Sequence, residues 1–374
     1  MKKEQIPELK EYIKYSDNIE LKQPNEDEDS REVVESMARV NKIMFERYRH
    51  GIRDAHAKTH GVLRAELEIY DNLPSYLAQG IFKEPKKYPV IIRFSTAPGM
   101  IEPDKKSMMR GMALKIIGVE GEKFLPEDKD ALTQDFLLVN YPIIPTGTVK
   151  DYLDQQKQIE EHINTPELIQ TVQNVMATAG RKIKNVLGKE EEPNNFGIPG
   201  SHILGDRYFS MAAIRYGDYV AKISIAPKSE NVAVLHGKDM DSDLIKAEPE
   251  TFLTTIVTNF FKDQTAEYEL SAQLCTDLQK MPVEDGSVQW PEEVSPYQPI
   301  AKLTIYPQDS FSPGRRVYGD DVLSFNPFHC LPEHRPLGNI MRVRRLAYET
   351  SSKYRHHMNA QPRIEPRSID ELPE

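Results

Sequence analysis

Short, mainly apolar runs with the character of β-strands recur between residues 61 and 140 and again between residues 209 and 306. Proline, glycine and aspartate separate the short apolar runs, which is typical of an antiparallel sheet or barrel. The runs that carry this pattern are 62–69, 88–95, 111–117, 136–139, 209–225, 268–275 and 300–306.

Three other segments carry apolar residues at helical spacing. These are 31–49, 148–187 and a segment that begins near Asn339, shortly after Pro336. The second lies between two groups of strands, so the order favours an α+β barrel with a helical insertion over alternating βαβ units. Its part 166–187 is a candidate channel wall, although an ordinary packed amphipathic helix is the simpler interpretation.

The ends of the chain differ from its middle. Residues 1–35 are polar and acidic, and we expect an arm that is mobile unless a partner orders it. Residues 36–360 are predicted to form one domain, in which the proline-rich stretch 281–338 wraps around the rest. Residues 361–374 contain three prolines and are expected to be irregular.

Charge and composition exclude several classes of protein. The 374 residues include 48 Lys plus Arg and 58 Asp plus Glu, and this acidic balance argues against general binding to nucleic acid. No run approaches the ~18 apolar residues that a membrane span requires, and no apolar stretch follows Lys2 and Lys3, so neither a membrane span nor a secretory signal is expected. Cys275 and Cys330 alone make no disulfide framework, which favours the cytoplasm.

Arg344 and Tyr348 lie four apart in the last predicted helix and therefore share a face, as does Arg355 seven residues further on. A guanidinium beside a phenol favours the phenolate, and tyrosine is one of the known axial ligands of haem iron. Taken alone, such a pair is more often ordinary surface packing.

Other candidate residues lie near the first strands. His56 and His60 precede the first strand, where they are either general acid–base groups or surface histidines. Arg93 and Ser95 alternate with apolar residues and therefore point to one side of a strand. We expect this side to face into the barrel, where the two residues would need polar partners, although a side that faces solvent is the alternative. Asn140 follows the run 136–139, which it can simply cap.

Taken together, six short motifs occur in the order found in haem catalases. The sequence is most similar to the small, catalase-related haem proteins that lack a C-terminal extension domain, and the resemblance covers roughly residues 40–360. The motifs are Arg53-x-x-His56-Ala57-Lys58, Arg93-Phe94-Ser95, Arg110-Gly111-Met112-Ala113-x-Lys115, Asn140-Tyr141-Pro142, Phe325-Asn326-Pro327 and Arg344-x-x-x-Tyr348.

The resemblance implies a catalase-like antiparallel β-barrel and a role for each candidate. His56 would be the distal histidine that moves the peroxide proton, Ser95 the residue that orients it, and Asn140 the distal hydrogen-bond donor to peroxide. Tyr348 would be the proximal iron ligand, with Arg344 as its charge partner. The arginines that would pair with the haem propionates are Arg53, Arg93 and Arg355.

It also implies haem b as cofactor and a homo-oligomeric enzyme of the oxidative stress response. Hydrogen peroxide, organic hydroperoxides or both would be decomposed or used peroxidatically through an oxoferryl intermediate. No nicotinamide site is predicted.

Two alternatives remain open. A related branch, the allene oxide synthases, isomerises fatty-acid hydroperoxides, but it carries threonine directly before the distal histidine, where this chain has Ala55. A non-enzymatic zinc or haem protein is the other alternative, although its candidate ligands match no standard zinc spacing. Those ligands are His329, Cys330, His334, His356 and His357.

Overall fold

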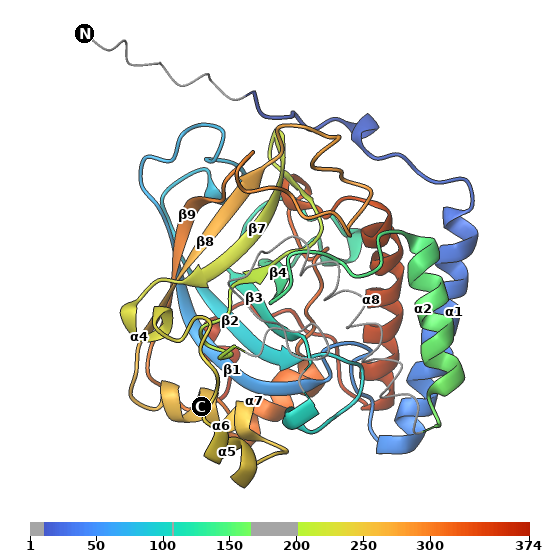
Figure 1. The fold of residues 1–374 in the computed structure, drawn as a ribbon, viewed down its shortest axis with the longest axis vertical. Coiled ribbons are helices and arrows are strands. Elements are labelled where there is room, and N and C mark those ends of the chain that lie inside the picture. Colours follow the sequence, from blue (N-terminus) through green and yellow to red (C-terminus); the bar gives the residue numbers. More distant parts are fainter. Residues whose placement is uncertain (1–10, 107, 166–200) are drawn as a thin grey trace.

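The computed structural model describes residues 11–106, 108–165 and 201–374, and its centre is a closed antiparallel β-barrel (Figure 1). The strand order is β5-β4-β3-β2-β1-β9-β8-β7, and β5 pairs with both β4 and β7, which closes the ring. The short strand β6 pairs with β7 alone. The strands are β1 (Lys58–Ile69), β2 (Lys87–Thr96), β3 (Arg110–Ile117), β4 (Thr133–Val139), β5 (Tyr208–Phe209), β6 (Ile214–Tyr216), β7 (Tyr219–Pro227), β8 (Ala266–Leu274) and β9 (Gln298–Ile305).

Helices cover two regions of the barrel. Helices α8, α2 and α1 stand beside one another along one flank, and α5 and α6 lie at the lower end in Figure 1. No helix in the described part of the chain has an apolar stretch long enough to cross a membrane. The helices are α1 (Glu26–Tyr48), α2 (Val149–His162), α4 (Glu230–Ala233), α5 (Ser242–Ala247), α6 (Phe252–Phe261), α7 (Pro313–Val317) and α8 (Asn339–Met358).

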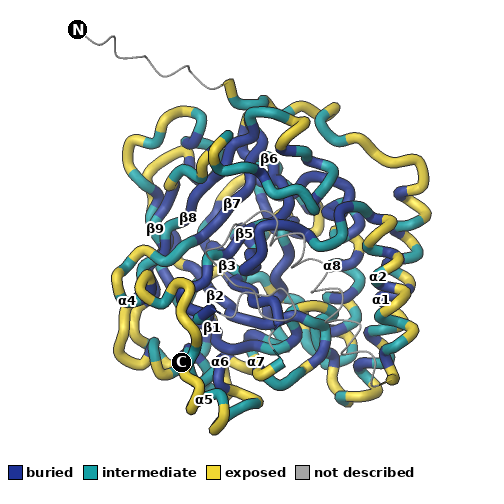
Figure 2. Tube along the Cα trace, in the orientation of Figure 1, coloured by how far each residue is buried: buried dark blue, intermediate teal, exposed yellow. Residues whose placement is uncertain are grey.

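The barrel interior is filled by the apolar side chains of the alternating strands. On β2, Ile92 and Phe94 belong to this core and are fully buried. Figure 2 shows that the barrel strands are largely buried, whereas the outer sides of α1 and α2 are exposed. Arg93 and Ser95 therefore point outward, because successive side chains of a strand face opposite sides. The expectation that they face into the barrel is wrong.

The predicted α+β barrel is confirmed, and six of the seven strand runs correspond to single strands. The exception is 209–225, which the chain divides among β5, β6 and β7. Gly217, with a φ of 62°, lies at the turn between β6 and β7. A single apolar run therefore contains a hairpin, because glycine adopts this left-handed conformation readily.

The helices agree less closely with the sequence pattern. Helix α1 begins at Glu26 rather than at residue 31, and α2 accounts for the start of 148–187, whereas 166–187 lies outside the described residues. The last helix begins at Asn339, as predicted. Helix α6 was not predicted, because its Thr, Ile and Val residues are equally typical of strands.

The N-terminal arm is attached to the barrel from residue 11 onward, which corrects the expectation of a mobile arm through residue 35. The amide of Ile13 donates to the carbonyl of Cys275 at 2.8 Å. Arg342 of α8 donates from Nη1 to the carboxylate of Glu20 at 2.8 Å and from Nη2 to that of Glu26 at 2.8 Å. At the other end, the irregular tail buries Leu372 completely.

Candidate active site

A large cavity lies between the outer face of β2–β4 and helix α8. It encloses about 1090 Å³, part of which is open to solvent. Its floor follows the strand register, in which Ser95 pairs with Gly111 and Gly111 with Val139. Seven of the eight predicted site residues line it: Arg53, His56, Arg93, Ser95, Arg344, Tyr348 and Arg355. We call this space the main cavity.

Helix α8 supplies one wall because its cavity-facing residues recur every three or four positions. Arg344, Tyr348, Ser352 and Arg355 line the main cavity, whereas Leu346 on another face is 44% exposed. The predicted sharing of a helix face is thus confirmed.

His56 is held in an unusual backbone conformation. Its φ is 52°, in the left-handed region that non-glycine residues rarely adopt. Three contacts fix it: the Ser95 hydroxyl lies 3.2 Å from Nδ1, Arg93 donates to the His56 carbonyl at 2.8 Å, and the next amide, that of Ala57, donates to Pro98 at 3.1 Å. Such strain persists only where the surroundings determine it, which is common at functional sites.

The electrostatic surroundings keep the His56 imidazole neutral. Burial, followed by the positive charges of Arg93 and Arg344, lowers its pKa from 6.5 to about 3. A neutral imidazole has one nitrogen free to accept a proton. The side chain is therefore in the state that a general base needs at neutral pH.

Gly111 leaves room for this histidine. A Cβ at residue 111 would lie 2.7 Å from His56 Nδ1 and 2.8 Å from Ser95 Oγ, which is closer than real Cβ atoms approach. Only glycine fits here without displacing the imidazole.

We therefore expect Gly111→Ala to displace His56 from Ser95 and to lower, by about tenfold or more, the turnover of any reaction in which His56 transfers a proton, while the barrel still folds. Matched circular dichroism spectra and a kinetic assay of both proteins test this. Gly118→Ala is the control for glycine replacement near a strand end, because no atom lies within 4 Å of a Cβ there, although its φ of 82° adds some strain. Unchanged turnover in Gly111→Ala would contradict the proposed fit.

Arg344 and Tyr348 form a direct pair on the α8 wall. Arg344 Nη2 donates to Tyr348 Oη at 2.8 Å. Burial lowers the pKa of Arg344, but Tyr348, Tyr152 and Asp54 outweigh that effect and the pKa is raised overall. The guanidinium is thus a permanent positive charge against the phenol oxygen, as a tyrosinate ligand would require.

Three arginines gather at one end of the main cavity. Arg53 and Arg355 both donate to the carbonyl of Leu323, at 2.8 and 2.9 Å. The carboxylate of Asp320 lies 3.4 Å from Arg53 and 3.6 Å from Arg93. Within the described residues, these are the only ion pairs that the three guanidinium groups make.

This arginine cluster has more positive than negative charge. Burial and mutual repulsion lower the pKa of Arg93 to about 9 and that of Arg355 to about 8. Asp320 lies at ion-pair distance from Arg53 and Arg93 but not from Arg355, and Asp321 acts on the cluster only from further away, so a carboxylate ligand would find an arginine without an ion pair here. Bidentate carboxylate binding is the contact that arginine favours.

The residues around the main cavity fit a haem group. A haem would place its two propionates against the arginine cluster and its flat apolar body against residues such as Leu137, Val139, Met211 and Phe325. Tyr348 would then supply the oxygen ligand for the iron, and His56 would lie in the same cavity as the iron-binding residue. The observation that favours this fit is that Arg355 is buried beside an apolar cavity and makes no ion pair within the described residues.

Asn140 is the predicted site residue that lies elsewhere. Its amide nitrogen donates to Asp206 at 3.1 Å, and its oxygen accepts from the Arg110 amide at 2.8 Å. Asn140 is 5% exposed and is not among the residues that line the main cavity. Its role as a donor to peroxide stays a prediction, and this conformation does not support it.

Asp54 is a site residue that the sequence analysis missed. It lines the main cavity, accepts a hydrogen bond from Ser351 of α8, and has a pKa raised by burial. Asp54 occupies a variable position of the Arg53-x-x-His56 motif, so no sequence pattern indicated its role. Asp320 was missed for another reason. Its ion pairs with Arg53 and Arg93 join segments that lie far apart in the chain.

Two of the histidines considered for a zinc site have other partners. His329 Nδ1 lies 3.1 Å from an oxygen of Asp135, and His356 Nε2 lies 3.0 Å from the carbonyl of Val322. Cys330 is fully buried. Across residues 11–106, 108–165 and 201–374, no group of three or more His, Cys, Asp or Glu is arranged to hold a metal ion.

Comparison with known proteins finds likeness in structure alone. No protein-family model matches the chain, and no curated protein sequence is significantly similar to it. A fungal catalase superimposes with a TM-score of 0.60 at 16% identity, covering 88% of this chain and 67% of its own. The chain has the catalase-like fold.

Two further solved structures agree. Catalase A from Saccharomyces cerevisiae gives a TM-score of 0.60 at 14% identity over 88% of this chain and 70% of its own. A bacterial catalase gives 0.58 at 15% identity over 96% and 68%. At such identities the catalase-like fold is shared, and the chemistry has to be argued from the side chains.

Proposed function

We propose that this protein is a haem-dependent enzyme that acts on peroxides. The observation that carries the proposal is that the His56–Ser95 pair and the Arg344–Tyr348 pair line one cavity. The first pair offers an acid–base group, and the second offers an oxygen ligand with a positive charge fixed beside it. The arginine cluster adds the recognition of carboxylates that a haem requires.

Tyr348 would hold the cofactor through its oxygen, and Arg344 would place a positive charge beside that oxygen, because the guanidinium already donates to Oη at 2.8 Å. When bound, the haem supplies an iron centre that a peroxide can oxidise by two electrons. The apolar walls of the main cavity would exclude bulk water from that centre.

His56 would carry the proton. With Nδ1–H donating to Ser95 Oγ, the other nitrogen accepts the proton of the peroxide and returns it to the leaving oxygen. One hydrogen peroxide is thereby reduced to water, and a second is oxidised to dioxygen, so that two H₂O₂ give two H₂O and one O₂. An organic donor can replace the second peroxide.

Oxygen release tests this function directly. An oxygen electrode should record dioxygen from hydrogen peroxide in proportion to the concentration of haem-loaded protein. If an organic hydrogen donor is oxidised without release of dioxygen, the enzyme is a peroxidase. The absence of both reactions in haem-loaded protein would refute the proposal.

The arginine cluster leads to a separate prediction about cofactor binding. Haem-free protein should bind haemin at least about a hundredfold more tightly than haemin dimethyl ester, because the ester lacks both carboxylates. Arg355→Gln should reduce the difference in affinity between haemin and its ester. Arg345→Gln should leave that difference unchanged, because Arg345 does not line the main cavity. Equal binding of haemin and its ester would show that the cluster does not recognise propionates.

A further inference from the structure

The sulfur atom of Met341 lies beside the guanidinium group of Arg344. The two residues are three positions apart on α8 and therefore share a face of the helix. Arg344 Nη1 lies 3.9 Å from Met341 Sδ, and Nη2 of the same guanidinium donates to Tyr348 Oη at 2.8 Å. One guanidinium group thus connects an oxidisable sulfur to the phenol that is proposed to bind iron.

Met341 is buried among apolar side chains and borders the main cavity. It is 5% exposed, belongs to an apolar cluster that includes Val343 and Ala347 of the same helix, and lines the main cavity. Peroxides oxidise the thioether of methionine to methionine sulfoxide. A peroxide that enters the main cavity would therefore meet this sulfur, although the sulfur is shielded from bulk solvent.

The surroundings of Met341 suit the oxidised side chain. Methionine sulfoxide carries a polar oxygen, and burying a polar group in an apolar site is unfavourable unless the group is hydrogen-bonded. Arg344 Nη1 is a donor at this position, and within the described residues it makes no other hydrogen bond. A charged donor bonds an oxygen acceptor more strongly than a thioether sulfur, which accepts only weakly. Oxidation would therefore draw the guanidinium toward residue 341.

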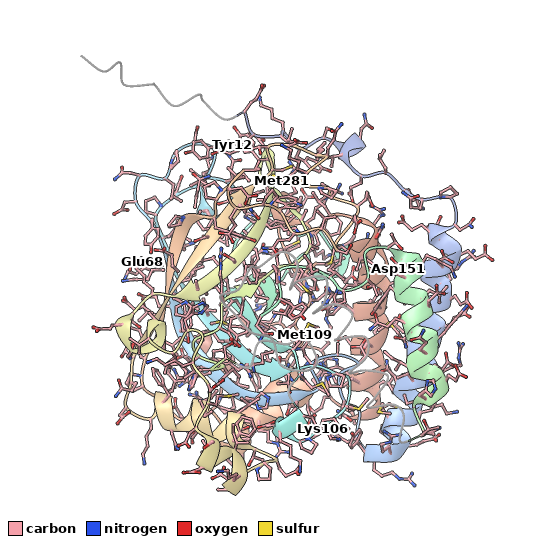
Figure 3. The ribbon with its side chains drawn as sticks, in the orientation of Figure 1. Tyr12, Glu68, Lys106, Met109, Asp151 and Met281 are labelled. Atoms are coloured by element: carbon pink, nitrogen blue, oxygen red, sulfur yellow. The ribbon has the colours of Figure 1, made fainter. Side chains whose placement is uncertain are left out.

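Two other methionines show what is particular about Met341. Met211 also lines the main cavity and is 8% exposed, but within the described residues its sulfur accepts no hydrogen bond. Met281, near the upper end of the molecule in Figure 3, is fully buried and does not line the main cavity. Of these three, Met341 alone combines a place on the cavity wall with a charged donor at its sulfur.

We propose that Met341 is a site of oxidative modification, at which a peroxide in the main cavity forms the sulfoxide and thereby draws Arg344 away from Tyr348. The sulfur attacks one oxygen of hydrogen peroxide, so that an S–O bond forms and the O–O bond breaks. The departing oxygen takes the proton of the oxygen that stays on sulfur and leaves as water. Sulfur loses the two electrons that the peroxide gains.

The modification would make the iron-binding residue sensitive to excess peroxide. With the guanidinium drawn toward the sulfoxide, less positive charge would remain beside the Tyr348 oxygen, and the haem would be held less firmly. Methionine sulfoxide is reduced again by methionine sulfoxide reductases, so the change is reversible. This effect on Tyr348 rests on the proposed function, whereas the oxidation of Met341 requires only a peroxide.

Peptide mass spectrometry tests the modification site itself. The purified protein, with the haem that it carries, is exposed to hydrogen peroxide for a series of times and then digested. Sulfoxide should form at Met341 faster than at Met211 by about threefold or more, a factor that one additional hydrogen bond supplies. Met281 should stay reduced over the same times. Equal rates at Met341 and Met211, or a Met341 that stays reduced, would overturn the proposal.

Substitutions test the effect on Tyr348 without an oxidant. Met341→Gln offers Arg344 an amide oxygen, whereas Met341→Leu keeps a similar volume and accepts no hydrogen bond. The Gln variant should bind haemin about threefold or more weaker than the Leu variant, and its haem spectrum should differ. Equal haemin binding and equal spectra in the two variants would show that residue 341 does not act on Tyr348 through Arg344.

Reversal of the oxidation serves as a second test if Met341→Gln does not fold. Treating the oxidised wild-type protein with methionine sulfoxide reductases should restore the original haem spectrum. Met341→Leu should show no lasting spectral change after peroxide treatment. Met358→Leu is the matched control, because Met358 ends the same helix and does not line the main cavity, and this variant should respond to peroxide as the wild-type protein does. A lasting change of equal size in Met341→Leu would overturn the effect on Tyr348.

The outcomes separate this inference from the proposed function. Protein that carries haem and decomposes hydrogen peroxide, but in which Met341 stays reduced, would overturn the inference and leave the proposed function intact. Protein that forms the sulfoxide preferentially at Met341 but binds no haem would support the modification site and refute the proposed function.

Discussion

Haem-loaded His56→Ala protein will keep its cofactor and lose peroxide turnover by about 10²–10⁴-fold, the usual contribution of a positioned acid–base group. The loss follows from position and protonation state together. His56 lies in the main cavity with Nδ1 held by Ser95, and its pKa of about 3 leaves it neutral at physiological pH. Steady-state kinetics, normalised to haem content, measures the effect.

The control is His357→Ala, which removes an exposed histidine from α8 outside the main cavity. Its turnover should match that of the wild-type protein. Full activity in haem-loaded His56→Ala would show that His56 does not transfer the proton, and it would contradict the proposed mechanism.

Tyr348→Phe is expected to lose most of its haem, and any haem that remains will have a changed visible spectrum. The substitution removes one oxygen atom, the atom that accepts from Arg344 at 2.8 Å. It also leaves the half-buried Arg344 without its phenol partner, which destabilises the site further. Haem content per chain and the absorption spectrum are the two measurements.

Tyr354→Phe is the matched change, because Tyr354 lies on the same helix and packs edge-on against Phe45 at 6.5 Å. This variant should keep its haem and its spectrum. If Tyr348→Phe behaved in the same way, Tyr348 would not be the iron ligand.

Local periodicity predicted much of the candidate site. The helical spacing of Arg344, Tyr348 and Arg355 places all three on the main cavity, as the pattern indicated. The strand period also placed Arg93 and Ser95 on one side of β2. It did not determine which side, because a period of two defines two faces equally and only the packing of α8 decides which is covered.

Local sequence patterns do not predict contacts between segments that lie far apart in the chain. Asn140 is bound by Asp206, which lies 66 residues later, and this bond accounts for its absence from the cavity wall. Asp54 meets Ser351 only because α8 packs beside the barrel. Helix α6 was missed because β-branched residues in an apolar run do not distinguish a helix from a strand.

The central claim is that the main cavity binds haem through Tyr348. The most direct measurement is the haem and iron content of the purified protein, determined per polypeptide chain and accompanied by its absorption spectrum. We predict one iron porphyrin per chain, with a spectrum that changes when peroxide is added. Protein that neither contains haem nor takes it up when haemin is supplied would contradict the claim.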